Sequence, residues 1–194
     1  MKNNPLDVNT FIVCGRPKFY SLKEYKNERG TYQKFSIAIE LAGLSKYLWV
    51  SVGLVGPDND KKAPFTKEEF EKAEYVTITD LAMDSYIDKQ GTTKYGTKCS
   101  GKSVLLGLNL NANVGWCFGR IANISEPNRK TRVKLPYLHK KVGSSDKPTV
   151  EHKMALVKWI DSGPMPKVDQ DVLILASVKT LDDGTPYLQA GRVA

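Results

Sequence analysis

The stretch Thr31–Gly56, TYQKFSIAIELAGLSKYLWVSVGLVG, indicates two β-strands joined by a short turn at residues 42–45. Apolar residues fall at positions 35, 37 and 39 in the first strand and at positions 48, 50, 52 and 54 in the second. This period of two is typical of a strand with one buried face and one solvated face. The stretch therefore predicts a half-buried hairpin at the centre of the fold.

Trp49 is out of phase with the apolar residues of its strand, as are Tyr47 and Ser51. A large ring on the polar face of a sheet, beside a lysine of the neighbouring strand, suits a flat partner such as a nucleobase. The alternative is that Trp49 packs under a loop or under a second domain. Both interpretations stay open at this point.

The composition is that of an ordinary globular protein with an excess of cations. Of the 194 residues, 41% are hydrophobic and 26% are charged, and the formal net charge is +8. The length allows one large domain or two small ones. The basic balance favours a polyanionic partner.

Targeting signals and metal-binding cysteine patterns are absent from the sequence. No apolar run of 18 residues and no basic leader followed by an apolar segment occurs, which predicts a cytoplasmic protein with no membrane partner. Cys14, Cys99 and Cys117 form no CxxC pair, so we expect buried, reduced thiols and neither a disulfide framework nor a zinc ribbon. Neither His139 nor His152 has a metal-ligand partner at a suitable spacing, so we expect both at the surface.

Basic and aromatic residues alternate between Pro17 and Gly30, which we expect to form a loop or a ragged hairpin. Cations such as Lys18 and Lys23 suit a phosphate backbone, and rings suit bases. The alternative is an ordinary solvated loop.

A short helix follows the central hairpin. Thr66 and Glu69 have the spacing of a capping box, and Phe65 and Phe70 have that of a hydrophobic staple, so the helix starts there and ends near Glu74. Strands are then expected over residues 75–88 and 92–106. The order of three strands, a helix and two strands is that of an oligonucleotide/oligosaccharide-binding (OB) barrel, a five-stranded Greek-key barrel.

The second half of the chain repeats this pattern. The pair Gly15–Arg16 recurs as Gly119–Arg120, and the turn at 88–92 recurs at 182–185. A third strand at 153–160 carries Trp159, and residues 171–181 and 187–193 form the last two strands. We therefore predict an all-β protein of two tandem five-stranded OB barrels, over residues 1–110 and 114–194, with the helix only in the first.

Four segments resemble the strands of single-stranded DNA-binding proteins from bacteria and their phages: residues 10–16, 32–40, 47–54 and 169–194. The resemblance implies binding of single-stranded DNA, with the aromatic of the third strand against the bases. Those bacterial proteins have one barrel and an acidic tail that recruits other proteins. Two barrels and an ending in Gly191–Ala194 look more like a phage or otherwise divergent version, in a host-cell cytoplasm if viral, with neither tail-mediated recruitment nor the bacterial tetramer.

Residues 96–103, GTKCSGKS, match the phosphate-binding loop pattern GxxxxGK[ST]. That loop needs a buried strand before it and a helix after it. The residues before Gly96 are polar, and Gly107 with three asparagines makes a poor helix after Ser103. We interpret the segment as a basic last strand of the first barrel, with Lys94, Lys98 and Lys102 on one face.

Together these features predict a protein that binds single-stranded DNA without sequence preference in replication, recombination or repair, and not an enzyme. RNA is compatible with the same chemistry, and a homodimer and replication or recombination proteins are further expected partners. No cofactor, metal or catalytic residue is predicted. The alternative is an OB-fold interaction or assembly module that binds no nucleic acid. The residues predicted to bind DNA are the rings Trp49, Tyr47, Tyr32, Tyr137 and Trp159 and the cations Lys34, Lys18, Lys23, Lys94, Lys98, Arg129, Lys130, Arg132 and Lys134.

Overall fold

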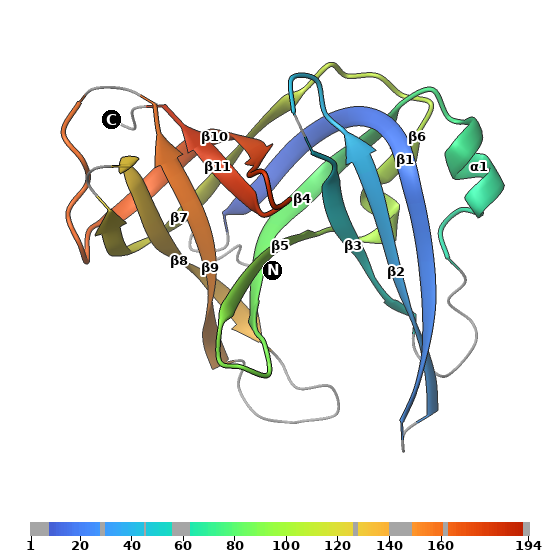
Figure 1. Ribbon diagram of the computed structural model, residues 1–194, viewed down its shortest axis with the longest axis horizontal. Coiled ribbons are helices and arrows are strands. Elements are labelled where there is room, and N and C mark those ends of the chain that lie inside the picture. Colours follow the sequence, from blue (N-terminus) through green and yellow to red (C-terminus); the bar gives the residue numbers. More distant parts are fainter. Residues whose placement is uncertain are drawn as a thin grey trace.

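The computed structural model describes residues 8–27, 30–44, 46–55, 63–125, 128–139, 149–160 and 163–191. Within these ranges the fold is almost entirely β (Figure 1), with one short α-helix and one 3₁₀ turn. In chain order the elements are β1 (Asn9–Asn27), β2 (Gly30–Glu40), β3 (Leu48–Val55), α1 (Lys67–Lys72), β4 (Val76–Ile87), β5 (Thr93–Lys98), η1 (Gly101–Ser103), β6 (Val104–Leu106), β7 (Asn113–Ser125), β8 (Lys130–His139), β9 (Thr149–Trp159), β10 (Asp171–Thr180) and β11 (Pro186–Ala190).

The strands close into two barrels. In the first, β1 pairs with β2, β2 with β3, β3 in parallel with β5, β5 with β4, and β4 with β1. In the second, β7, β8, β9, β11 and β10 follow the same circuit, with β9 and β11 as the parallel pair. The prediction of two tandem five-stranded OB barrels is thus confirmed. The domain bounds stay predictions; β6 ends at Leu106 and β7 begins at Asn113.

The long strand β1 joins the two barrels. Its first residues, Asn9–Val13, pair with Cys117–Asn113 of β7, and its later residues pair with β2. In Figure 1 it is the long blue strand that arches from the second barrel to the first. Of the two alternatives predicted for residues 17–30, the loop is wrong and the ragged hairpin is confirmed, because β1 pairs with β2 as far as Asn27 and Gly30, with a register shift after Pro17.

A glycine marks the same barrel corner in both copies. A Cβ added at Gly15 would lie 2.5 Å from the carbonyl oxygen of Glu40, and one added at Gly119 would lie 2.5 Å from that of Lys134. In each copy a register shift follows, between Pro17 and Phe19 in β1 and between Ile121 and Asn123 in β7. The repeated Gly-Arg pair thus reflects a repeated close approach of backbones.

The tight turns that precede the last strand of each barrel also correspond. Asp88 N donates to Thr92 O and Gly91 N to Asp88 O; Leu181 N donates to Thr185 O and Gly184 N to Leu181 O. Gly91 and Gly184 both have positive φ, of 77° and 83°. Between Gly163 and Gln170 of the second copy the structure has no helix, as expected.

The helix α1 begins as predicted. Thr66 accepts from the backbone N–H of Glu69, whose carboxylate accepts from Thr66 N, and the Phe65 and Phe70 rings stack at 5.9 Å. The helix ends at Lys72, earlier than predicted. Its buried Phe70 packs near Tyr20, whose pKa is raised by burial and, to a smaller extent, by the Glu69 carboxylate.

The predicted strand at 92–106 is wrong in its second part. β5 ends at Lys98, η1 follows, and β6 pairs with the start of β4 rather than continuing β5. Lys102 lies in η1 and so does not share a strand face with Lys94 and Lys98.

None of the helices in the described ranges has the length and apolar character that a membrane crossing requires.

We expect that Gly15→Ala and Gly119→Ala each lower the free energy of unfolding by about 1–3 kcal/mol, the usual cost of overpacking. The added methyl would meet a carbonyl oxygen that cannot move without breaking strand pairing. Gly96→Ala in β5 is the matched control, because a Cβ there meets nothing within 4 Å. Denaturant unfolding checks this; equal stability of Gly119→Ala and Gly96→Ala would contradict it.

The three cysteines are free, but only Cys117 is fully buried, which corrects the prediction for Cys14 and Cys99. Burial raises the pKa of Cys117 to about 12, and burial with the nearby Asp80 carboxylate raises that of Cys99 to about 12. Because the thiolate is the reactive form, we expect negligible alkylation of both at neutral pH in the native protein. Mass spectrometry of iodoacetamide-treated protein, with and without denaturant, checks this; rapid native labelling of Cys117 would contradict the burial.

Candidate nucleic-acid interface

Three aromatic side chains gather on the outer face of the first barrel, and we call Phe19, Tyr47 and Trp49 the ring cluster. The Phe19 and Trp49 rings are nearly parallel, at 7°, with centroids 5.9 Å apart, and Tyr47 meets Phe19 edge-on at 5.3 Å. Phe19 and Trp49 are each 48% exposed. Trp49 therefore does not pack under a loop or a second domain, and the flat faces of the cluster reach solvent.

The strand register explains why these rings meet. Phe19 of β1 and Trp49 of β3 both pair with Ala38 of β2, so the two rings flank one small side chain. Leu48 and Val50, on either side of Trp49, point into the barrel and are fully buried. The same alternation that fills the core thus directs the indole outward.

Phe19 is the residue of this cluster that the sequence analysis missed. Phe11 and Val13 point inward, and strict alternation from them would bury position 19 as well. The register shift after Pro17 reverses the phase, so that Phe19 faces out while the Tyr20 hydroxyl donates to the carbonyl of Phe65. The corner glycine followed by Pro17 was the available signal, since bulges reverse side-chain phase.

Small polar residues and lysines continue this outer face. Ser21, Ser36 and Ser51 pair in one row across β1, β2 and β3, and Lys23 and Lys34 are opposite each other and exposed. Repulsion between the two ammonium groups would be relieved by an anion. The side chain of Tyr32 lies outside the described residues.

Two predicted lysines already have acidic partners. Lys18 Nζ lies 2.9 Å from Glu40 Oε2 and 6.0 Å from the centroid of the Tyr47 ring. Lys94 Nζ lies 3.6 Å from Asp88 Oδ2. Lys94 also pairs in register with Tyr86 of β4, an exposed ring that the sequence analysis did not name.

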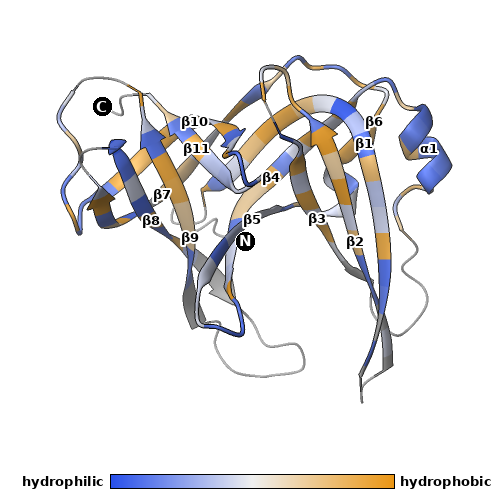
Figure 2. Ribbon diagram, viewed as in Figure 1, coloured by the Kyte–Doolittle hydropathy of each residue, from blue (hydrophilic) through white to orange (hydrophobic). Residues whose placement is uncertain are grey.

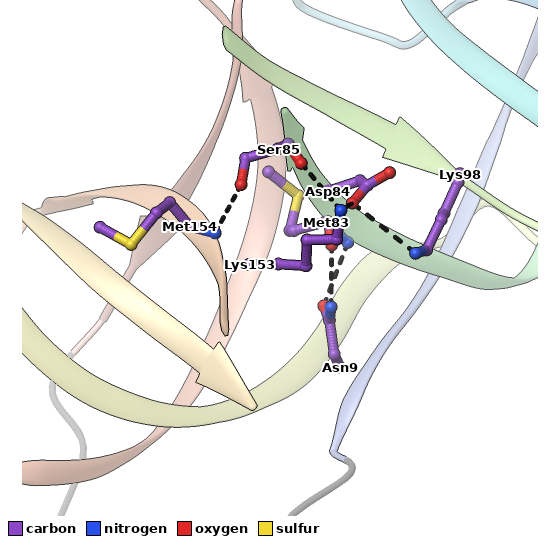
Figure 3. A network of polar contacts seen from close by, with 7 residues as sticks. All are labelled: Asn9, Met83, Asp84, Ser85, Lys98, Lys153 and Met154. Atoms are coloured by element: carbon purple, nitrogen blue, oxygen red, sulfur yellow. Dashed lines mark hydrogen bonds and ion pairs between the residues drawn. The ribbon is translucent and has the colours of Figure 1, made fainter. Parts of the chain in front are cut away.

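Lys98 belongs to a polar seam between the two barrels (Figure 3). Asp84 Oδ1 of β4 lies 3.6 Å from Lys98 Nζ of the first barrel and 3.3 Å from Lys153 Nζ of the second. Next to it, the Met154 N–H donates to Ser85 Oγ at 2.7 Å and Lys153 Nζ donates to Ser85 O at 3.0 Å. This seam holds β4 against β9, so the two barrels are connected at a second place besides the β1–β7 pairing.

The second barrel presents its predicted cations on β8. Lys130, Arg132 and Lys134 alternate with the buried Thr131, Val133 and Leu135 and so face outward. Arg129 is different, because its guanidinium donates to the carbonyl of Gly163 at 2.8 Å and holds the loop after β9.

Of the two rings predicted for the second barrel, Trp159 does not add to this face. Trp159 is only 6% exposed, and its indole N–H donates to Thr131 Oγ1 at 3.1 Å. Its expected role as a stacking ring is therefore wrong, because it shares the inward phase of Ala155 and Val157. The side chain of Tyr137 lies outside the described residues.

The phosphate-loop match at 96–103 has none of the required context. Gly96, Thr97 and Lys98 belong to β5, and the next regular element after η1 is the strand β6 rather than a helix. No group of three or more potential metal ligands occurs among the described residues, where His152 is exposed. The side chain of His139 is not among them.

The fold has a counterpart of known function. The crystal structure of the wild-type single-stranded DNA-binding protein from Thermus aquaticus matches 96% of this chain and 92% of its own, with a TM-score of 0.56 and 11% sequence identity. The predicted resemblance is confirmed at the level of the fold. No protein-family model and no curated protein matches the sequence.

We expect Phe19→Ala to shift the tryptophan emission of the free protein to longer wavelength, because water then replaces the Phe19 ring beside the Trp49 indole. Steady-state fluorescence measures the shift. The control is the same substitution in a Trp49→Phe background, where only Trp116 and Trp159 emit and no shift is expected. A shift in both backgrounds would show that Phe19 does not shield Trp49.

Proposed function

We propose that this chain binds single-stranded DNA without sequence preference, with the ring cluster as the stacking platform for bases. The observation that carries the proposal is the parallel Phe19–Trp49 pair, half exposed on the polar face of an OB barrel. Every base has a flat π-face, so stacking on such rings is tolerant of sequence. The fold match to a single-stranded DNA-binding protein supports the same role.

The cations around the ring cluster suit the backbone of the same ligand. Lys23 and Lys34 face each other beside the serine row, and Lys98 pairs with Ser51 at the β5 end of that row. A backbone that follows the row can meet ammonium groups beside it and at its end while its bases reach Trp49. We therefore assign Lys18, Lys23, Lys34, Lys94 and Lys98 to phosphate contacts, with Lys18, Lys94 and Lys98 exchanging their present carboxylate partners for phosphate.

The proposed role is binding without catalysis, in replication, recombination or repair of DNA. Stacking and phosphate contacts do not discriminate DNA from RNA, so RNA is a second candidate ligand for the same surface. The cytoplasmic location and the protein partners of such a role stay predictions. The comparisons give no support to a phage source.

One observation favours the alternative role as an assembly module. On β7 and β10 the side chains of Val114, Trp116, Leu173 and Leu175 are all between 41% and 50% exposed, and Trp116 pairs in register with Leu175. An exposed apolar patch of this kind is typical of a protein interface. In this second proposal a second copy of the chain covers the patch and the protein is a homodimer.

Trp49→Ala is expected to weaken binding of every single-stranded oligonucleotide by about 5- to 150-fold, since stacking one base contributes about 1–3 kcal/mol. Titration of oligo-dT and of mixed-sequence oligonucleotides, followed by fluorescence anisotropy, measures the loss.

Trp116→Ala is the matched control, because Trp116 is equally exposed but pairs with Thr10, nine residues before Phe19 and roughly 30 Å away along β1. It should leave the affinity unchanged. Unchanged binding in Trp49→Ala, together with a lower mass of Trp116→Ala in sedimentation equilibrium, would favour the assembly module instead.

A further inference from the structure

The corner glycines and register shifts allow the outer faces of the two barrels to be compared position by position. Phe19 in β1 corresponds to Asn123 in β7, since each is the first paired residue after the shift. The registers then match one row of the first barrel, Phe19–Ala38–Trp49, with one row of the second, Asn123–Arg132–Leu156. Tyr47 corresponds in the same way to Met154. No member of the ring cluster has a flat counterpart in the second barrel.

The rows on either side of Phe19–Ala38–Trp49 also correspond to rows of the second barrel, and those rows carry more cations. The serine row Ser21–Ser36–Ser51 corresponds to Ser125–Lys130–Lys158. On the other side, Glu40, which pairs with Arg16, corresponds to Lys134, which pairs with Arg120. Positions that are small or acidic on the first barrel are thus cationic on the second, whereas the aromatic positions become neutral, non-aromatic residues.

We call Lys130, Arg132, Lys134 and Lys158 the cationic face. Within the described part of the chain none of the four makes an ion pair. β8 is blue at its start in Figure 2, where Lys130 and Arg132 lie. Arg120 is not part of this face, because two hydrogen bonds to Asp171 occupy its guanidinium and lower the pKa of that carboxyl. Four adjacent cations on the two paired strands β8 and β9, without acidic partners, are a site for an extended polyanion.

We propose that the outer face of β7, β8 and β9 binds the phosphate backbone of single-stranded nucleic acid and not its bases, while the first barrel binds the bases. This inference rests on the proposed function and divides it between the barrels. The cationic face adds a salt-dependent, base-independent part to the affinity, and the ring cluster adds a part that depends on bases.

Phe118 is a ring at the edge of this face. It lines a hollow on the second barrel together with Lys134, Arg120 and His152, and it is half-buried. Because Phe118 precedes the register shift, it corresponds to Cys14 rather than to a member of the ring cluster. Phe118→Ala therefore tests whether the second barrel binds bases in this hollow.

The experiment exchanges the corresponding residues of the two faces in the full chain. The cationic variant carries Lys130→Ser, Arg132→Ala and Lys158→Ser, and the ring variant carries Phe19→Asn and Trp49→Leu, so each receives the residues of the other barrel. The probes are oligo-dT and an abasic oligonucleotide of equal length, titrated over a range of salt concentrations. Circular dichroism and thermal unfolding verify that both variants fold.

The cationic variant should lose affinity for both probes, and the slope of log K against log salt should fall by about 2, since each phosphate contact on a single strand contributes about 0.7. The ring variant should lose affinity for oligo-dT by about tenfold or more and keep its affinity for the abasic probe. An unchanged slope in the cationic variant, or an equal loss for both probes in the ring variant, would overturn the proposal. So would a Phe118→Ala protein that loses affinity for oligo-dT alone.

Failure of the proposed function has a different signature. If the unmodified protein binds oligo-dT no more tightly than the abasic probe, base stacking by the first barrel is refuted. Loss of abasic binding in the cationic variant would still support the backbone site in that case, and retention of abasic binding would refute it.

Discussion

The close approach of backbones at Gly15 and Gly119 is the constraint on which the rest of the structure depends. At each position a strand passes so near a neighbouring carbonyl oxygen that a side chain has no room. This permits the strand to turn from one part of the barrel wall to the next, which a small closed barrel requires. The register shift that follows reverses the phase of the strand, and this reversal directs Phe19 to solvent and Tyr20 to the core.

The two barrels share one backbone geometry but have different outer surfaces. Inward positions of both barrels are aliphatic or aromatic and form one connected core, so they leave little freedom for change. Outward positions meet only solvent and cross-strand neighbours, and there the two copies diverge. Lysines and an arginine of the second barrel replace small or acidic residues of the first, and neutral, non-aromatic residues replace its rings. A duplicated fold can therefore keep its packing while its two outer faces acquire different ligand chemistry.

The sequence predicts the barrels well because they depend on local patterns. Alternation defines β2 and β3, the Thr66 and Glu69 spacing defines the start of α1, and repeated glycines reveal the second copy. It predicts the site less well. Phe19 was missed because a bulge reverses the alternation, and the corner glycine followed by Pro17 is the one sequence signal for that bulge. Trp159 was misassigned although it shares the inward phase of Ala155 and Val157; its hydrogen-bond partner Thr131, on another strand, is known only from the structure. The partners of Lys98 and Arg129 likewise come from distant segments, since Asp84 and Gly163 reach them only in the folded chain.

The double connection between the barrels has a thermodynamic consequence. β1 pairs with β7 at one place and Asp84 lies between lysines of both barrels at another, so the two outer faces keep a fixed separation. On the proposed function, a polynucleotide held by one face presents its next segment to the other at a high effective concentration, with no linker entropy to lose. Two individually weak contacts then combine into avidity within a single chain.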